Sequence, residues 1–529
     1  MKIFITILTG VWLTPFIGFA DQQCSFGGYS WIYSLVDGTA KITGVYPQPS
    51  GTLVIPDSLD GYPVTTVGPY AFNNCSSLTS ASIPDTVTNI GEGAFRACSS
   101  LNSISIPSSV TNICPSTFSG CSSLASVAIP DSITNIGNHA FASCSSLASV
   151  TIPNCVANIG DGAFISCISL TEVTIPGCVE CIGVNAFYDC RLLTTVLLED
   201  GVASIGECAF HGCTSLRSIT IPNSVTNLSY CAFLECSSLT TATIPDSITY
   251  FGCDVFSRCT ALTTVIMQNG MLSIGGGAFS GCTSLIEVTM PNSITNIGDG
   301  AFSDCTSLTT VTMSDNIINI EQDAFRGCTS LSTMALPDGV ISIGDGAFSA
   351  CSSLSSIVIP NTVTNIGTYA FSDCISLTSL PIPYGVTSIG RGTCYNCASL
   401  IHTTIPDSVT YIGGQAFSKC TSLSSVLIPN SVTSIDVDAF SLCTSLTSVT
   451  IPNGVIGIGE GAFCFCTALA SVDIANSVTS MDGMVFKGCT SLTSIIIPDG
   501  VTSIGIEMFN GCSSLESVAL PNSIIRIGS

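Results

Sequence analysis

The chain has 529 residues, of which only 9% are charged, and its 35 acidic against 11 basic side chains give a formal net charge of −24. So few Lys and Arg residues cannot neutralise a phosphate backbone, which makes nucleic acid and anionic membranes poor partners. A hydrophobic content of 46% excludes intrinsic disorder.

Residues 1–20 have the pattern of a secretory signal peptide. Lys2 precedes the apolar run Ile3–Phe19, and Gly18 and Ala20 supply the small residues typical of a cleavage site. We expect cleavage after Ala20 and no membrane insertion after that cleavage, because no other apolar run approaches the length of a membrane span. An uncleaved membrane anchor is the alternative.

The next segment, residues 21–52, contains two runs with β-strand composition. Tyr29–Val36 and Thr39–Val45 are joined by Asp37-Gly38, a favourable two-residue hairpin turn. The segment is therefore expected to form an N-terminal β-hairpin cap over the first coil of the repeat region that begins at residue 53.

Residues 53–529 repeat a unit of 23 residues. A cysteine recurs at this interval twenty times, from Cys75 to Cys512, and a leucine follows each one three residues later. A period this strict makes each unit one coil of a solenoid, because a segment of this size cannot bury its apolar side alone. The first coil has five surplus residues, expected as a small loop at Leu59–Pro63, and the last coil is expected to be truncated at Ser529.

One unit, Cys121–Ser143, shows the pattern of every coil. Val127 and Ile129 alternate with small or polar residues, which predicts a strand, and Pro130 ends it. A short extended segment follows, and His139–Ser143 is long enough for a single helical turn. The side chains expected to face the core are Cys121, Leu124, Val127, Ile129, Ile133, Ile136, Ala140 and Phe141.

The segment Leu124-x-x-Val127-x-Ile129-x-x-Ser132 resembles the leucine-rich repeat L-x-x-L-x-L-x-x-N/C. With the recurring cysteine, the Ile-Pro pair and the Ile-Gly…Ala-Phe-x-x-Cys return, the unit is similar to the BspA-like leucine-rich repeats of surface proteins. The resemblance implies a leucine-rich repeat solenoid of the β-rich α/β class, with about twenty coils. One face would be a parallel β-sheet and the other would hold short strands or helical turns. Members are described as surface antigens and adhesins, and no catalytic residue transfers.

Thirty cysteines in an exported protein would ordinarily indicate disulfides. The twenty in register are expected to stack roughly 4.8 Å apart with parallel side chains and two equivalent neighbours each, which favours a column of buried free thiols. Among the others, Cys208 and Cys231 are the favoured disulfide candidate, with free thiols as the alternative. Cys208, His211 and Cys231 lack a fourth metal ligand, so no metal site is predicted.

The outward positions of the predicted sheet are the fifth and seventh after each repeat cysteine, and most are Ser or Thr. Departures are few: Glu172, Glu287, His402 and Asp473 are polar, whereas Leu197, Ile266, Leu427 and Ile496 are apolar. The candidate binding residues are Ser149, Thr151, Glu172, Thr174, Thr241, Thr243, Glu287, Thr310, Thr312 and His402. Glu172 and Glu287 are five coils apart, roughly 24 Å, which is too far for a catalytic carboxylate pair.

The sequence contains three scattered histidines and no Ser/His/Asp grouping or phosphate-binding loop, so we expect neither enzymatic activity nor a cofactor. The prediction is a secreted or cell-surface protein of the adhesion type. It would present its Ser/Thr-rich sheet face to an extracellular protein or glycan, in host matrix or on neighbouring cells. The alternative is a passive structural spacer or coat component without a specific ligand.

Overall fold

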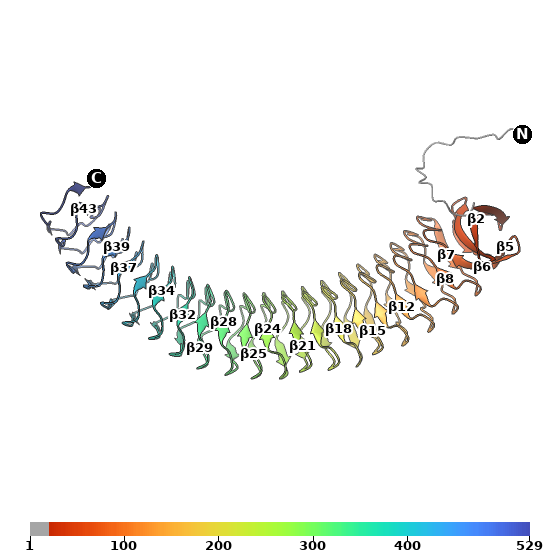
Figure 1. Ribbon diagram of the computed structural model, residues 1–529, viewed down its shortest axis with the longest axis horizontal. Coiled ribbons are helices and arrows are strands. Elements are labelled where there is room, and N and C mark those ends of the chain that lie inside the picture. Colours follow the sequence, from red (N-terminus) through yellow and green to blue (C-terminus); the bar gives the residue numbers. More distant parts are fainter. Residues whose placement is uncertain (1–20, 529) are drawn as a thin grey trace, which may run out of the picture.

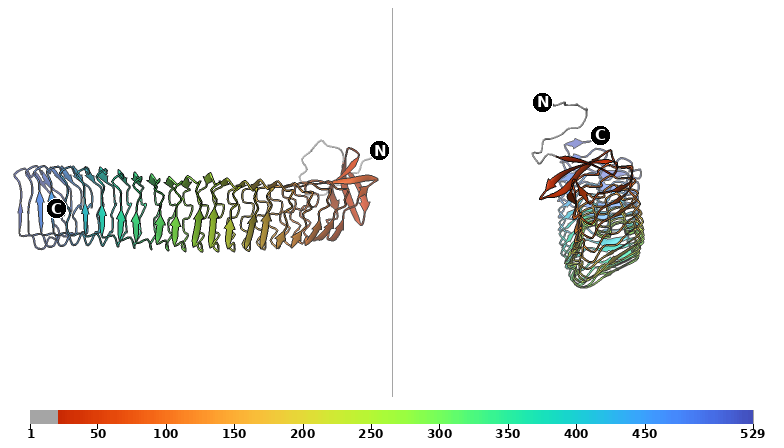
Figure 2. Two further views of the ribbon diagram at one scale, coloured as in Figure 1. Left: turned by 90° about the horizontal axis from the view of Figure 1, so that it is seen from below. Right: turned by 90° about the vertical axis from the view of Figure 1, so that its right-hand side faces the viewer.

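The structure is a computed structural model that describes residues 21–528, so the predicted signal peptide at residues 1–20 lies outside the described residues. The described chain is a solenoid of stacked coils that curves into a shallow arc (Figure 1). Seen along its length and from its end, the solenoid is a long body with a narrow cross-section (Figure 2). The predicted leucine-rich repeat solenoid is confirmed.

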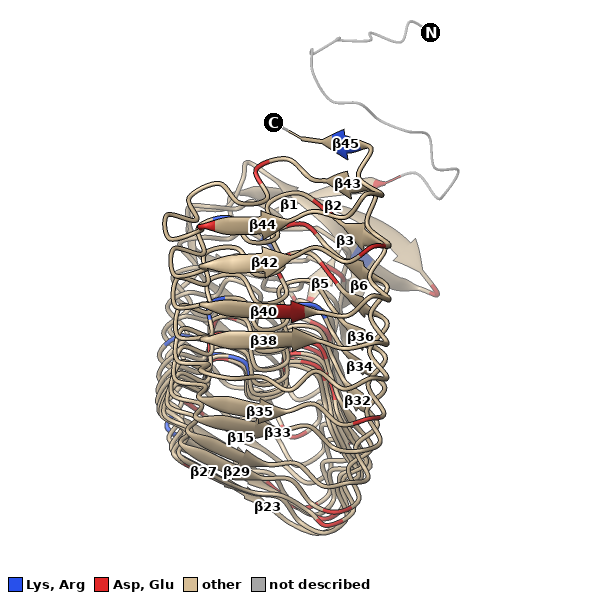
Figure 3. Cartoon of the chain, turned by 90° about the vertical axis from the view of Figure 1, so that its left-hand side faces the viewer, with Lys and Arg blue, Asp and Glu red and all other residues tan. Residues whose placement is uncertain are grey.

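Two rows of parallel strands run along the solenoid. In coil Cys121–Ser143 the first row contributes β11 (Ser126–Val127) and the second contributes β12 (Asn135–Ile136). Each pairs in parallel with its counterpart one coil later, β13 (Ser149–Val150) and β14 (Asn158–Ile159). We call these rows the first sheet and the second sheet. The first sheet lies on the outer side of the arc (Figures 1 and 3).

The other strands of the first sheet are β4 (Gly51–Val54), β7 (Leu78–Ser82), β9 (Ser103–Ser105), β15 (Glu172–Ile175), β17 (Thr195–Leu198), β19 (Ser218–Thr220), β21 (Thr241–Ile244), β23 (Thr264–Met267), β25 (Glu287–Thr289), β27 (Thr310–Thr312), β29 (Thr333–Ala335), β31 (Ser356–Val358), β33 (Ser379–Pro381), β35 (His402–Thr404), β38 (Ser448–Ile451), β40 (Ser471–Ile474), β42 (Ser494–Ile496) and β44 (Ser517–Ala519). Those of the second sheet are β6 (Tyr62–Val67), β8 (Asn89–Ile90), β10 (Asn112–Ile113), β16 (Cys181–Ile182), β18 (Ser204–Ile205), β20 (Asn227–Leu228), β22 (Tyr250–Phe251), β24 (Ser273–Ile274), β26 (Asn296–Ile297), β28 (Asn319–Ile320), β30 (Ser342–Ile343), β32 (Asn365–Ile366), β34 (Ser388–Ile389), β36 (Tyr411–Ile412), β37 (Ser434–Ile435), β39 (Gly457–Ile458), β41 (Ser480–Met481), β43 (Ser503–Ile504) and β45 (Arg526–Ile527).

The core is a set of columns, each made of the same repeat position in successive coils. In coil Cys121–Ser143 all eight side chains expected to face the core are buried. The phenylalanines form the largest column, with rings from Phe72 to Phe371 stacked at centroid distances of 5.1–5.8 Å. Because each ring is buried by rings of the coils before and after it, the stability of one coil depends on its neighbours.

The return segment after the second sheet contains no helix, nor does any other part of residues 21–528, so the predicted helical turn is wrong. His139 and Ser143 have φ values of 55° and 58°, and two residues in the left-handed region four positions apart interrupt a right-handed helix. The amides alternate instead: Ala142 N donates to His139 O within the coil, whereas His139 N donates to Asp161 O of the next coil at 2.8 Å. The return segment is therefore a third ladder that joins coil to coil.

The column cysteines are hydrogen-bond donors as well as core residues. Cys121 Sγ donates to the carbonyl oxygen of Phe95 at 3.2 Å, and the same bond, from each cysteine to the residue 26 positions earlier, recurs along the column. Burial raises the pKa of the Cys121 thiol to about 12, so it stays protonated and able to donate. The thiol thus satisfies a buried carbonyl, a role that the interpretation as a small hydrophobe did not include.

The N-terminal segment forms three antiparallel strands. β2 (Tyr29–Val36) and β3 (Thr39–Tyr46) pair around Asp37-Gly38, and β1 (Gln22–Phe26) adds a strand that the sequence pattern did not indicate. β3 continues into the second sheet by pairing in parallel with β6.

Side chains also hold this segment against the first coil. Trp31 is fully buried and packs edge-on against Phe72, at the end of the phenylalanine column, with a centroid distance of 6.2 Å. The surplus residues form a small hairpin in which β5 (Ser58–Leu59) pairs with β6, and the Tyr33 hydroxyl donates to Asp60 Oδ2 in its turn at 2.7 Å.

Candidate functional site on the first sheet

The candidate binding residues lie at outward positions of the first sheet, as the repeat spacing requires. Nine of the ten are exposed, and the tenth, Thr243, is half-buried. The buried residue between each outward pair, such as Val173 between Glu172 and Thr174, fixes the direction of both side chains because strand side chains alternate.

The structure brings these residues together in separate groups. Ser149 pairs in register with Glu172, and Glu172 pairs with Thr195 of the following coil. Ser149, Thr151, Glu172 and Thr174 line one shallow groove together. Asn154, Thr195 and Leu197 are further exposed residues of this groove, and the apolar Leu197 side chain is 54% exposed.

The remaining candidates form three further positions on the face. Glu287 lies beside Thr310, and Thr289 beside Thr312. Thr241 and Thr243 lie between β19 and β23, and His402 lies beside Ser379. Glu287 and Glu172 are separated by the whole of β17, β19, β21 and β23, so the two carboxylates cannot act on one bond.

Hydroxyl groups elsewhere on the coil are already used by the fold. Thr171 Oγ1 donates to Ala148 O of the preceding coil at 3.2 Å, Thr249 Oγ1 to Thr226 O at 3.1 Å, and Ser132 Oγ to Val110 O at 2.7 Å. Among the described residues, the seven Ser and Thr hydroxyls of the candidate set make no such bond to protein. The first sheet therefore presents the hydroxyls that are free to bind another molecule. The recurrence of Thr at two further repeat positions could have indicated the internal ladders from sequence.

The charged residues at the outward positions of this face are all acidic. Its outward positions between Ser80 and Ala519 hold Glu172, Glu287 and Asp473 and no Lys or Arg. Figure 3 shows the first sheet near the C-terminal end, with β40 carrying acidic colour among uncharged neighbouring strands.

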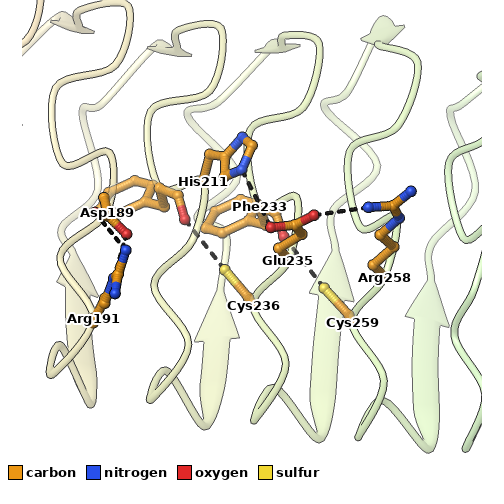
Figure 4. A network of polar contacts seen from close by, with 9 residues as sticks. Asp189, Arg191, His211, Phe233, Glu235, Cys236, Arg258 and Cys259 are labelled. Atoms are coloured by element: carbon orange, nitrogen blue, oxygen red, sulfur yellow. Dashed lines mark hydrogen bonds and ion pairs between the residues drawn. The ribbon is translucent and has the colours of Figure 1, made fainter.

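Several basic side chains on or next to the return turns form ion pairs (Figure 4). Arg258 binds Glu235 at 3.0 Å, and the same carboxylate contacts His211 Nε2 at 3.6 Å. Arg191 binds Asp189 at 2.7 Å. These pairs are partly or largely exposed to solvent, and each contributes little to stability.

Cys208 and Cys231 lie on these return turns, in adjacent coils and away from the first sheet. Both are half-buried free thiols in the structure, and burial, aided by the Cys208 thiol, raises the pKa of Cys231 to about 12. Their disulfide stays a prediction.

The potential metal ligands of the described chain are dispersed. No group of three or more His, Cys, Asp or Glu side chains between residues 21 and 528 is arranged to hold a metal ion. Within the same range, no helix is long and apolar enough to cross a membrane.

The repeat matches a known family over almost the whole solenoid. The family described as "BspA type Leucine rich repeat region (6 copies)" matches residues 65–194, 180–309, 295–424 and 410–529. The chain belongs to the BspA-type leucine-rich repeat family. No curated protein matches the chain.

Several solved structures are similar to the chain. A leucine-rich repeat protein from Bacteroides ovatus is 29% identical, with a TM-score of 0.53, and the alignment covers 75% of this chain and 92% of that one. A leucine-rich repeat protein from T. pallidum is 34% identical over 35% of this chain and 87% of its own, with a TM-score of 0.33. A leucine-rich cell surface protein from Faecalibacterium prausnitzii is 23% identical over 94% of this chain and 95% of its own, with a TM-score of 0.29.

Proposed function

We propose that the protein is exported and binds an extracellular protein or glycan, without catalysis, through the outward face of the first sheet. The observation that carries the proposal is the contrast between hydroxyls: those of the candidate set are exposed and make no side-chain bond within the described chain, whereas other columns bond to the preceding coil. Repeat solenoids use such extended faces for binding.

The face is suited to many weak contacts rather than one deep pocket. Its grooves are shallow, its side chains are short, and its exposed apolar residues, such as Leu197 and Ile266, are isolated among hydroxyls. Short Ser and Thr side chains lose little conformational freedom when they bind, which favours an extended polar ligand. A surface that spans many coils can engage several such contacts at once.

The test is saturable binding of the purified chain to a panel of glycans and extracellular-matrix proteins. A variant with Thr241→Arg, Thr310→Arg and Thr312→Arg should lose the binding of the wild-type chain. The matched control, Ser273→Arg, Ser388→Arg and Ser480→Arg, places the same charge and bulk at exposed positions of the second sheet and should bind normally.

Two results would contradict the proposal. Equal binding by both triple variants would show that the first sheet is not the binding face. Absence of saturable binding to any member of the panel would favour the passive spacer instead.

Export has its own test. If residues 1–20 are a signal peptide, N-terminal sequencing of the secreted protein should begin at Asp21. A protein that retains Met1 in the cell would contradict cleavage.

A further inference from the structure

A second groove on the first sheet, near the C-terminal end, combines an exposed leucine with two carboxylates. It extends over four coils and has apolar residues at its floor and acidic or amide groups around them. The groove residues used below are Asp407, Leu427, Asn430, Asn453, Asp473 and Asn476.

The first sheet is interrupted inside this groove. The coil that begins at Cys420 contributes no strand to the first sheet, and its contact with β35 is a single bridge between Thr404 and Leu427. On its other side β38 pairs with β40 and, among the described residues, with no strand before it. Leu427 lies at this interruption and is 76% exposed.

Carboxylates lie at the two ends of the groove. Asp407 and Asp473 are exposed, and neither makes a side-chain hydrogen bond or ion pair within the described residues. Asn430, Asn453 and Asn476 continue the column of Asp407 through the next three coils, and their amide side chains line one edge of the groove. None of the residues that line the groove is Lys or Arg, so no basic side chain of the groove neutralises the two carboxylates.

We propose that this groove docks an extended, positively charged segment of a partner protein. Two basic side chains of the segment contact Asp407 and Asp473, and an aliphatic side chain between them covers Leu427. The carboxylates are three coils apart, about 14 Å along the solenoid axis at the spacing of parallel strands. They are also offset across the face, because Asp407 is the tenth residue after its repeat cysteine and Asp473 the seventh. Basic residues four positions apart in an extended chain span about 13 Å of backbone, and their long side chains cover the remaining offset. The inference rests on the proposed function, because it assigns a class of partner to one part of the same face.

Charge complementarity selects this occupant over a neutral glycan. A neutral sugar would leave both carboxylates without a counter-charge, and sugar binding usually uses exposed aromatic rings, which are absent from the residues lining this groove. A cationic segment satisfies both carboxylates and gains contact with the exposed leucine.

The experiment measures binding of the full chain to a labelled five-residue peptide with lysine at both ends and valine at its centre. We expect saturable binding that weakens as ionic strength rises. The variant Asp407→Asn with Asp473→Asn should weaken binding roughly tenfold or more, because it removes both charged contacts. Leu427→Ser should weaken it several-fold, and the same peptide with glutamates in place of the lysines should not bind.

A matched variant separates this site from the overall charge of the chain. Asp299→Asn with Glu460→Gln removes the same two charges from exposed positions on the return turns and should leave binding unchanged. Equal weakening in both double variants, or no weakening in the groove variant, would overturn the inference, as would failure of the lysine peptide to bind.

The proposed function can survive that failure. If the first-sheet Arg variant abolishes binding of a panel ligand while Asp407→Asn with Asp473→Asn does not, the face binds partners but this groove does not select a basic one.

Discussion

Two neighbouring junctions between coils differ more than their sequences suggest. Between coils Cys328–Ala350 and Cys351–Asp373, both sheets pair (β29 with β31, β30 with β32), and Phe348 stacks on Phe371 at 5.6 Å. We call this the regular junction. Between coils Cys351–Asp373 and Cys374–Asn396, which we call the open junction, neither sheet pairs its strands and Phe371 meets Cys394 instead of a ring.

The open junction is held chiefly by the return segment. Tyr369, Phe371 and Asp373 still donate their amides to the next coil at 2.7–2.9 Å, and Cys397 Sγ donates to Phe371 O. A Cβ placed on Gly390 would lie 3.4 Å from Thr368 N, whereas at the regular junction a Cβ on Gly367 would lie 2.4 Å from Asp345 N. The coils are therefore further apart on the second-sheet side where the phenylalanine is missing.

A third junction has lost strand pairing but keeps ring stacking. Between the coils that begin at Cys466 and Cys489, neither sheet pairs, but Phe486 and Phe509 remain stacked at 6.2 Å. Ring stacking therefore persists at a junction where the strands do not pair, whereas the open junction lacks both.

The largest expected effect comes from creating a second ring gap. Phe302→Ala removes a fully buried ring from between Phe279 and Phe325 and should lower the free energy of unfolding by about 3–5 kcal/mol. The control, Cys394→Ala, changes a position that already lacks the ring and should lower it by about 1 kcal/mol. Urea denaturation measures both, and equal losses would contradict the role of the ring column.

The next largest effect is the difference in stability caused by adding one methyl group at the regular junction and at the open junction. Gly367→Ala places a Cβ against backbone atoms and should be destabilising by about 1–3 kcal/mol, whereas Gly390→Ala meets its neighbours at van der Waals distance and should be nearly neutral. Thermal unfolding of the two variants under the same conditions is the measurement. If Gly390→Ala is the more destabilising of the pair, the open junction is not the wider one.

Restoring the ring should have a smaller, opposite effect. Thr393→Ala with Cys394→Phe rebuilds the Ala-Phe pair found in the neighbouring coils and should stabilise the array by about 1 kcal/mol through stacking on Phe371 and Phe417. The coils before and after the open junction should also unfold more cooperatively with one another. Destabilisation would show that the space has closed around Cys394.

The smallest effect concerns a different junction, that between the N-terminal strands and the first coil. The hydrogen bond from Tyr33 holds the pKa of Asp60 below its ordinary value, and burial, with the Asp60 carboxylate, raises the pKa of Tyr33 to about 12. The contribution of ionised Asp60 to the free energy of unfolding is present above the ordinary carboxyl pKa of about 4. It is lost as the pH falls through the lower pKa that Asp60 has in the folded chain. The Tyr33 contribution is lost as the pH rises from about 10 towards 12.

Amide hydrogen exchange in β2 and β3 measures the acidic side of this dependence. Exchange, corrected for its intrinsic pH dependence, should reveal weaker protection in acid for the wild-type chain and no such loss for Asp60→Asn. The same acid response in both proteins would contradict a role for the Asp60 charge.

The repeat sequence was sufficient to predict the solenoid, because the 23-residue period and the alternation of Val127 and Ile129 admit few other folds. It did not predict the left-handed residues at His139 and Ser143, since neither is a glycine and a five-residue segment ending in Ala-Phe-Ala-Ser suits a helix equally well. The outward face followed from strand alternation at positions such as Ser149 and Thr151.

The two grooves could not be predicted in the same way. Leu427 and Asp473 stood out as departures from the Ser/Thr pattern, but no repeat position in the coil that begins at Cys420 predicted that this coil contributes no strand to the first sheet. The open junction had one visible signal, Cys394 in place of phenylalanine. That residue alone does not predict the unpaired sheets, because the coil that contains it pairs both sheets with the coil that begins at Cys397.

Hydrogen exchange at the second sheet tests most directly whether cohesion varies along the array. Thr364 N and Gly367 N donate to Ile341 O and Ile343 O at 3.0 and 2.9 Å, whereas Thr387 N and Gly390 N have no backbone acceptor in the described chain. The amides of Thr387 and Gly390 should therefore exchange much faster than those of Thr364 and Gly367. Equal protection at the four amides would show that the two junctions are equally closed, and would contradict the difference between them.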